Sequence, residues 1–375
     1  MKTFTGNFAI AFALILALSS GATSCAAASP AKKASGPISL PEGFSISAWA
    51  DDAPNARSLT VGDEGTVFVG TRAKDVVYAL KDEDGDGVAE LKWIIASGLN
   101  SPNGVAFKGG SLYVAEIGRI LRYDGIESRL NDPPAPVVVF DKLPTDAAHG
   151  WKYIAFGPDG MLYIPVGAPC NVCDKGDPYA SIHRINPDGS GHEIFARGIR
   201  NTVGFDWNPE TGVLWFTDNG RDWLGDDLPP EELNRAPEAG LHFGFPYRYG
   251  DNMPDPEFGD KGGSGPFAQP EWSFQAHTAC LGMEYYQGGM FPARYRETAF
   301  VAQHGSWNRS SKVGYRVMTV TIQDGKAVSA EPFAEGWLKG EKVSGRPVDF
   351  ATLDDGSLLI SDDYAGKVYR VAYGE

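Results

Sequence analysis

Loops between apolar segments carry most of the side chains in this sequence that could do chemistry. His149 stands in one such loop, after Asp146 and directly before Gly150. A neutral imidazole is a competent proton acceptor near pH 7, so His149 is a candidate general base. A lone loop histidine is more often a surface residue without a catalytic role. Whether His149 is a general base or an ordinary surface residue therefore depends on the other polar residues that the fold brings near it.

Further polar groups occupy comparable loops along the chain. Arg200 and Asn201 follow Gly198, and Gly220 and Arg221 follow the apolar segment that ends near Asn219. A rigid β scaffold presents such loop residues to solvent or to a ligand instead of packing them. The remaining candidates of this kind are Asn103, His277, His304 and Arg346.

Two of the four cysteines, Cys170 and Cys173, form a Cys-x-x-Cys pair in a loop. Such a pair is a disulfide, a redox pair or half of a metal site. No second pair of cysteines or histidines completes a zinc site, and an oxidising compartment favours the disulfide, which is our prediction. No histidine follows Cys173 to make a haem-attachment motif, because Asp174 stands there. Cys280 is left over and is expected to be buried and unpaired.

An acidic segment could hold a second, structural cation. Asp82, Asp84 and Asp86 occupy the first, third and fifth positions of a calcium-loop pattern, but Trp93 stands where the bidentate glutamate belongs. The segment is therefore either a structural calcium site in a hairpin or a plain Asp-Gly turn.

A short pattern recurs along the chain and predicts the fold. Each copy has a turn residue followed by an apolar strand, and hairpin chemistry such as Asp-Gly precedes most copies. The copies span residues 65–71, 110–116, 160–166, 212–218 and 356–362, with a weaker sixth at 297–303. Together with 46 glycines, 26 prolines and no sustained helical period, the pattern predicts an all-β, six-bladed β-propeller.

Propellers commonly close by pairing a strand from one terminus with the last blade. The segment 44–49 is the candidate closing strand, so we expect the N- and C-terminal strands to pair. Two separate β domains are the less favoured alternative, because the repeat is spread evenly. Residues 39–375 are thus expected to form a single propeller domain.

The N-terminus predicts export. Lys2 precedes an apolar run at 8–18 that is too short to cross a bilayer, so residues 1–28 are interpreted as a signal peptide and 29–38 as a linker. A lipoprotein signal ending before Cys25 is the alternative. The mature protein is expected to be periplasmic or secreted, or tethered by a lipid at Cys25, and no later segment is long and apolar enough to be a transmembrane helix.

The net charge of −15, with no run of Lys and Arg, makes nucleic acid and anionic membranes poor partners. The acidic residues are spread along the chain, which is typical of a solvated surface.

The loops at His149, Arg200-Asn201, Gly220, His277 and His304 together resemble the sugar dehydrogenases that use pyrroloquinoline quinone (PQQ), especially the sorbosone dehydrogenase branch. The resemblance runs from about Pro41 to the C-terminus. It implies a six-bladed propeller with PQQ across its axial cleft, a calcium ion on the quinone and a sugar above it. The chemistry implied is hydride transfer from a sugar aldehyde or hemiacetal hydroxyl to PQQ. Electrons would then pass to an external acceptor, which is a cytochrome, a copper protein or a quinone.

The same resemblance implies roles for individual residues. His149 matches the family's general base, and the backbone carbonyls of Gly220 and Arg221 match its calcium ligands. Glucose-oxidising relatives have proline at the second of these positions, which backbone ligation tolerates. The positions that match cofactor contacts are Arg200, Asn201, Arg346 and, less closely, Asn103.

His304 and His277 depart from the glucose-oxidising relatives, which have lysine and threonine there. These two histidines would contact PQQ carboxylates or substrate, or else only bond within their own loops. Two other functions stay open on the sequence: a calcium-dependent sugar lactonase on a six-bladed propeller, and a non-catalytic propeller that binds a glycan or protein. The sugar, the acceptor and the oligomeric state are not determined by the sequence.

Overall fold

A computed structural model describes residues 1–3, 38–262, 265–296 and 298–374 of the chain. Its contacts separate Met1–Pro30 from a compact unit, Ala31–Glu375. The predicted signal peptide, the lipidation site at Cys25 and the linker lie outside the described residues, except for the first three residues and Ile38.

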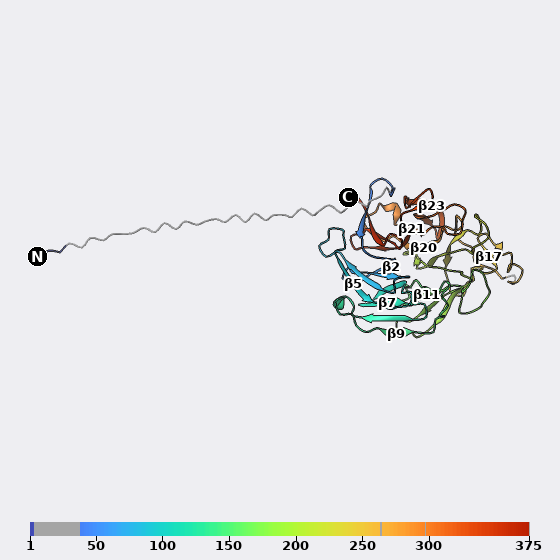
Figure 1. Cartoon of the computed structure of the whole chain (residues 1–375), viewed down its shortest axis with the longest axis horizontal. Coiled ribbons are helices and arrows are strands. Elements are labelled where there is room, and N and C mark those ends of the chain that lie inside the picture. Colours follow the sequence, from blue (N-terminus) through green and yellow to red (C-terminus); the bar gives the residue numbers. More distant parts are fainter. Residues whose placement is uncertain (4–37, 263–264, 297, 375) are drawn as a thin grey trace. The chain divides into compact units, whose positions relative to one another are not determined.

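The described residues of this unit form an all-β, six-bladed propeller in which each blade is a four-stranded antiparallel sheet (Figure 1). The first blade comprises β2 (Ala56–Val61), β3 (Val67–Thr71), β4 (Val77–Lys81) and β5 (Leu91–Ala96). The second comprises β6 (Gly104–Lys108), β7 (Ser111–Ala115), β8 (Ile120–Asp124) and β9 (Val137–Phe140). The third comprises β10 (Ala155–Phe156), β11 (Leu162–Val166), β12 (Ser181–Ile185) and β13 (Glu193–Arg197). The fourth blade comprises β14 (Phe205–Trp207), β15 (Leu214–Asp218), β16 (Glu231–Ala236) and β19 (Trp272–Phe274). The fifth comprises β20 (Cys280–Tyr285), β21 (Thr298–Gln303), β22 (Arg316–Gln323) and β23 (Lys326–Ala334).

The sixth blade confirms the predicted closure. Its strands are β26 (Pro347–Thr352), β27 (Leu358–Asp362), β28 (Lys367–Tyr373) and, from the other end of the unit, β1 (Phe44–Ala50). β1 pairs antiparallel with β28, with Phe44 opposite Tyr373 and Ile46 opposite Val371. The closing strand therefore fixes the beginning of the propeller to its end.

All six copies of the repeat are the second strands of the blades: β3, β7, β11, β15, β21 and β27. Every residue of β11, β15 and β27 is buried, because both faces of a blade are covered by neighbouring blades. The turn glycines before these strands have the left-handed backbone that a tight hairpin needs, with φ of 79° at Gly160 and 82° at Gly356.

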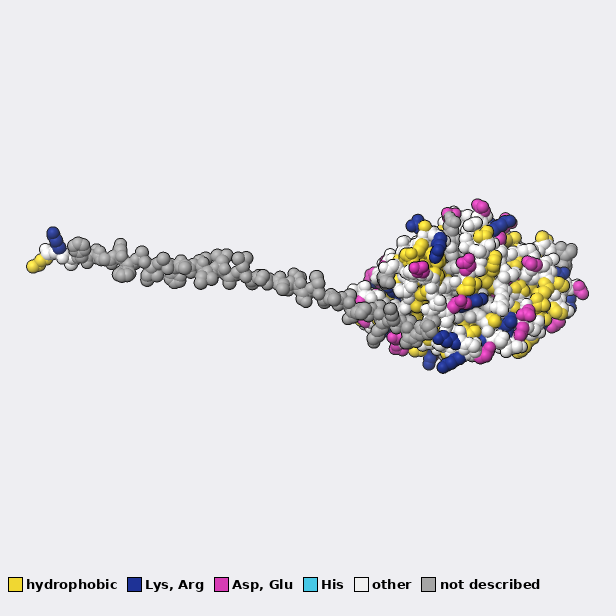
Figure 2. All heavy atoms as spheres, turned by 90° about the horizontal axis from the view of Figure 1, so that it is seen from above, with side chains coloured by type: hydrophobic (Ala, Val, Ile, Leu, Met, Phe, Trp, Pro, Cys, Tyr) yellow, Lys and Arg dark blue, Asp and Glu magenta, His cyan; other side chains and the backbone are white. Residues whose placement is uncertain are grey.

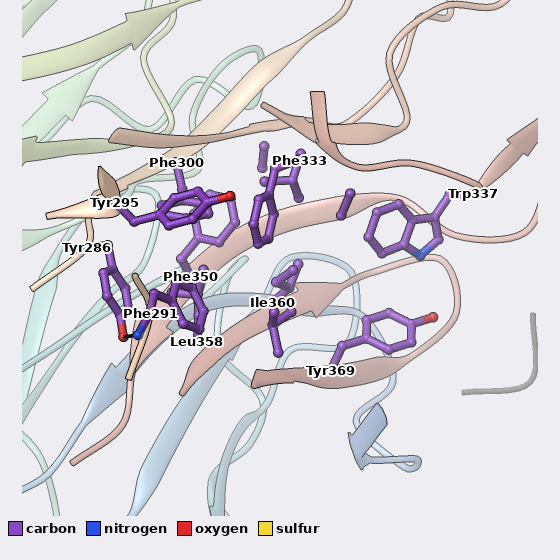
Figure 3. Packing of buried hydrophobic residues seen from close by; sticks show 14 of the residues in the cluster. Tyr286, Phe291, Tyr295, Phe300, Phe333, Trp337, Phe350, Leu358, Ile360 and Tyr369 are labelled. Carbon is purple, nitrogen blue, oxygen red and sulfur yellow. Dashed lines mark hydrogen bonds between the residues drawn. The ribbon is translucent and has the colours of Figure 1, made fainter. Parts of the chain in front are cut away.

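Apolar side chains fill the spaces between blades. Figure 3 shows the cluster between the fifth and sixth blades, where Phe300 and Phe333 meet Phe350, Leu358 and Ile360. The Phe300 and Phe333 rings pack edge to face with centroids 4.9 Å apart. Burying each such ring contributes about 1.5–3 kcal/mol, and because these contacts join different blades they stabilise the closed ring as a whole.

Short elements decorate the ring. They are the 3-10 helices η1 (Glu127–Arg129) and η2 (Ala293–Tyr295), the hairpin β17 (Arg248–Tyr249) with β18 (Met253–Pro254), and the hairpin β24 (Leu338–Lys339) with β25 (Lys342–Val343). Acidic and basic side chains are interspersed over the face seen in Figure 2. In the described part of the chain, no helix has the length and hydropathy that spanning a bilayer requires.

The antiparallel order within each blade determines which loops can meet. The connections into the first strand and those between the second and third strands lie at one end of the axis, and the other connections lie at the opposite end. Arg200, His277 and Arg346 belong to the first kind of connection, and Arg72, Asn219 and His304 to the second. All of these loop residues therefore gather at one end of the propeller.

Candidate active site

A cavity of about 390 Å³ opens at this end of the axis. It is lined by residues from five blades and brings together most of the candidate residues predicted from the sequence. Its walls include Arg57, Arg72, His149, Trp151, Arg200, Asn201, Asn219, Gly220, Asp222, Glu231, His277, His304, Trp307 and Arg346.

His149 is held in a defined orientation at the cavity wall. Its Nδ1 lies 2.7 Å from the carbonyl oxygen of Ala168, and because a carbonyl can only accept, Nδ1 carries the proton and Nε2 keeps a free lone pair. The backbone of His149 is left-handed, with φ of 48°. Gly167 permits the close approach, since a Cβ there would lie 2.6 Å from the Cβ of His149.

The imidazole of His149 is neutral at ordinary pH. Burial, followed by the positive charge of Arg200, lowers its pKa to about 4, although the hydrogen bond to the Ala168 carbonyl opposes this shift. A neutral ring with one free lone pair is the form that a general base needs. The geometry therefore supports the role that the sequence suggested for His149.

Arg200 is fixed by a dense set of acceptors. Its guanidinium donates to the backbone oxygen of Asn171 at 2.8 Å, to that of Asn219 at 3.1 Å and to Asp222 at 3.1 Å. The backbone amides of Arg200 and Asn201 both donate to the buried carboxylate of Asp218, at 2.9 and 2.7 Å. These contacts place a preorganised cation and an amide side by side in the cavity wall.

The predicted disulfide between Cys170 and Cys173 is present and contributes to this arrangement. Asn171 lies inside the closed loop, and its side-chain oxygen accepts from Arg200 at 3.0 Å and from the amide of Asp222 at 2.8 Å. The disulfide thus stiffens a segment that positions Arg200. Cys280 is buried and unpaired, as expected.

Asp363 organises the opposite wall. It accepts from Arg57 at 2.9 Å, from His304 at 3.0 Å and from Arg346 at 3.1 Å. Burial would raise the pKa of this carboxyl, but His304 and the two arginines hold it well below its usual range. Burial lowers the pKa of His304 despite the contact with Asp363. One carboxylate therefore neutralises only part of the positive charge gathered here.

Arg72 has no such partner. Its guanidinium lies 3.5 Å above the Trp151 ring, and among the described residues no carboxylate forms an ion pair with it. Burial and the charges of Arg57 and Arg346 lower its pKa to about 10. An unpaired cation facing a cavity that already holds other arginines indicates a site for an anionic ligand.

The predicted calcium loop lies beside this cavity. Gly220 lines the wall, and its amide donates to Glu231 at 2.9 Å. The other carboxylate oxygen of Glu231 accepts from Ala279 at 3.2 Å, so this side chain ties the fourth blade to the fifth. The side chain of Arg221 bonds Asp255 at 2.6 Å, and Arg221 is not among the lining residues, so its role as a backbone calcium ligand stays a prediction.

Two further candidates have different placements. His277 lines the cavity and its Nε2 lies 2.8 Å from the carbonyl oxygen of Gly225. Asn103 is buried behind the wall, where it accepts from Nε of Arg57 at 2.8 Å and donates to the backbone of Lys152 at 2.7 Å. Asn103 can therefore act on a ligand only through Arg57.

Asp82, Asp84 and Asp86 lie in the connection between β4 and β5, at the other end of the axis. One oxygen atom of each lies within 4.8 Å of the others, close enough to share a cation. The same carboxylates also accept backbone amides of their own turn, such as that of Gly85 at 2.8 Å. Both interpretations of the segment are compatible with this geometry.

Comparison with known proteins identifies the family. The family model described as glucose/sorbosone dehydrogenase matches residues 136–370, which is more than half of the chain. The chain belongs to this family. An uncharacterized protein of Borreliella burgdorferi is 34% identical over 352 residues, which cover 90% of this chain and 91% of that protein.

Solved structures confirm the fold. A Trichoderma reesei protein of carbohydrate-active enzyme family AA12 superposes with a TM-score of 0.77 at 19% identity, covering 90% of this chain and 98% of that one. The PQQ domain of the Coprinopsis cinerea pyranose dehydrogenase gives 0.75 at 16% identity, covering 91% and 98%. The PQQ-bound aldose sugar dehydrogenase of Streptomyces coelicolor gives 0.65 at 20% identity, covering 89% and 99%.

Several residues at the site of this dehydrogenase-family member were missed by sequence reasoning: the lining residues Arg57, Arg72, Trp151 and Glu231, and Asp363, which bonds three lining residues. A signal for two of them was present. Arg72 and Asp363 each directly follow a second strand, in the position that Asn219 and His304 occupy in other blades. In four of the six copies, the residue after the repeat therefore lines the cavity or bonds a residue that does: Arg72, Asn219, His304 and Asp363.

Proposed function

We propose that this protein is a PQQ-dependent sugar dehydrogenase that oxidises an aldehyde or a hemiacetal hydroxyl of a sorbosone- or aldose-type sugar. The observation that carries the proposal is the combination of a neutral, oriented His149 with an unpaired cation, Arg72, in one cavity. The glucose/sorbosone dehydrogenase family and the solved PQQ-containing proteins of similar fold support it.

The donor set of the cavity fits the proposed cofactor. PQQ is a tricarboxylate, and planar guanidinium groups bind carboxylates with two charge-assisted hydrogen bonds. Arg72, Arg200 and Arg346 would hold these carboxylates, with Asn201 and the two histidines, His277 and His304, as further polar contacts. The backbone carbonyls of Gly220 and Arg221 would hold the calcium ion, which would act as a Lewis acid.

When bound, PQQ would supply the acceptor for one hydride, which carries the two electrons removed from the sugar. The task of His149 is then to take the hydroxyl proton of a hemiacetal, or of the hydrate of an aldehyde, through Nε2 as the hydride leaves the same carbon. The hydroxyl O–H and the adjacent C–H bonds break, a C=O bond forms, and the sugar loses two hydrogens in total. The Ala168 carbonyl stabilises the imidazolium that results, since it accepts from Nδ1 in both protonation states.

The electrons then leave to an external acceptor, for which a cytochrome, a copper protein or a quinone is suited. We also propose export, with cleavage after residue 28 or lipidation at Cys25, because a disulfide such as Cys170–Cys173 persists in oxidising compartments. Intact mass of the protein recovered from its native host tests this: a full-length, unprocessed chain would contradict it.

Reconstitution tests the proposed activity. The purified propeller is mixed with PQQ and calcium, separately and together, and reduction of an artificial dye is followed with sorbosone and a panel of aldoses. Sugar-dependent reduction that needs both additions supports the proposal. Failure to bind PQQ, together with hydrolysis of a sugar lactone, would replace the proposal with the lactonase alternative. If the protein shows neither oxidation nor hydrolysis, the non-catalytic binding propeller becomes the favoured function.

A further inference from the structure

Two exposed tryptophans stand together at the rim of the cavity. Trp223 and Trp307 are 68% and 69% exposed, although large apolar side chains are usually covered. Their ring centroids are 5.4 Å apart and their planes meet at 84°. Trp307 lines the cavity itself, and so does Asp222, the residue before Trp223. The two rings form a right-angled corner that continues the cavity outward.

The corner is held by contacts between two loops of different blades. The side chain of Asn308 donates to Asp222 at 3.5 Å, and the amide of Ser310 donates to Asp226 at 2.9 Å. Arg309 pairs with Asp227 at 3.5 Å. These bonds flank Trp223 in the sequence and directly follow Trp307, so they hold the two loops together before any ligand arrives.

The backbone of Trp223 adds a second observation. Its φ of 71° is left-handed, a conformation that costs a bulky residue on the order of 1 kcal/mol or more and that persists only where the surroundings impose it. Here the strained backbone presents a tryptophan to solvent next to a cavity. Burial does not explain the residue, whereas ligand binding does.

We propose that Trp223 and Trp307 bind a second sugar ring, so that the protein acts on reducing oligosaccharides whose reducing-end ring enters the cavity. This inference rests on the proposed sugar oxidation. The C–H face of a pyranose matches an apolar aromatic surface, and the carboxylates and amide beside the rings can bond its hydroxyls.

The dimensions of the corner favour a sugar over a protein partner. Two indole rings at a right angle offer roughly the area of one pyranose, whereas a specific protein interface buries about 800 Å² on each partner. The flanking Asp222, Asp226 and Asp227 give the rim an acidic, hydrogen-bond-accepting character that suits hydroxyl groups.

Kinetics with matched saccharides tests the inference. The value of kcat/KM is measured for an aldose and for the disaccharide that carries the same aldose at its reducing end, in wild type, Trp223→Ala and Trp307→Ala. We expect each substitution to lower the disaccharide-to-monosaccharide ratio about tenfold, equivalent to about 1.4 kcal/mol. Ile94→Ala, at a residue of 58% exposure on β5, is the control and should leave the ratio unchanged.

A binding measurement separates failure of this inference from failure of the dehydrogenase proposal. Calorimetry on the propeller without cofactor uses a trisaccharide whose reducing end has been converted to an alditol, which cannot be oxidised as an aldose. Saturable binding that both tryptophan substitutions abolish supports the site even if no oxidation is found. An unchanged ratio in active variants, or an effect only on the KM of the electron acceptor, would overturn it.

Discussion

Replacing Arg72 with methionine separates a ligand-binding cation from a structural one. The guanidinium lies over Trp151 and makes no ion pair among the described residues, while burial and the charges of Arg57 and Arg346 lower its pKa. Folding therefore gains little from this charge. Methionine keeps apolar contact with the indole ring, so we expect the melting temperature without cofactor to change by less than about 2 °C.

Binding of PQQ should respond very differently to the same substitution. A hydrogen bond between an arginine and a carboxylate contributes about 1.5–3 kcal/mol, and each 1.4 kcal/mol is a factor of ten in Kd, so Arg72→Met should weaken PQQ binding about 10- to 150-fold. The assay is titration of the calcium-loaded protein with PQQ, followed by fluorescence or calorimetry. Arg129→Met, at an exposed arginine of η1, is the matched control.

Two outcomes would refute this reasoning about Arg72. An unchanged Kd for PQQ would mean that the unpaired cation does not face the cofactor. A large drop in melting temperature without cofactor would mean that Arg72 is structural. Arg57→Met provides the contrast, because Arg57 is buried and pairs with Asp363 and Asn103, so its loss should destabilise the fold itself.

Two further predictions concern stability. Burial raises the pKa of Asp349 to about 7, so between about pH 4 and 7 the folded state holds a proton that the unfolded chain has lost, and stability falls as pH rises through this window. Asp349→Asn removes that titration. The melting temperature of the variant minus that of wild type should therefore be about 2–4 °C higher at pH 8 than at pH 4.5. The same difference between the two proteins at both pH values would contradict this prediction. If the acidic turn binds calcium, replacing Asp84 and Asp86 with asparagine should remove a calcium-dependent rise in melting temperature, and a rise that survives would identify a plain turn.

The sequence predicted the fold well, for a physical reason. Each blade is covered on both faces, so its second strand is a short apolar run behind a turn residue, and this pattern survives in all six copies. The closing strand was equally predictable, because Phe44–Trp49 has no partner nearby in sequence and the last blade lacks a fourth strand. The pairing of β1 with β28 supplies it.

The site was predicted only in part. Loops with recognisable motifs gave His149, Arg200 and His304, and these do meet in one cavity. The ion pair between Arg57 and Asp363 joins residues 306 positions apart, and no local pattern reports such a contact. Asn103 was predicted to contact the cofactor because its loop reaches the site. Its side chain lies behind Arg57 instead, which a loop motif does not reveal.

The most direct test of the account is single-turnover reduction of bound PQQ by an aldose, measured from pH 5 to 9 in wild type and His149→Gln. The rate in wild type should be nearly constant across this range, because the pKa of His149 is lowered to about 4 and the base is neutral throughout. The variant should bind PQQ with unchanged affinity but react about 10²- to 10⁴-fold more slowly at every pH. Equal rates in the two proteins would contradict the assignment of His149 as the base and, with it, the proposed mechanism.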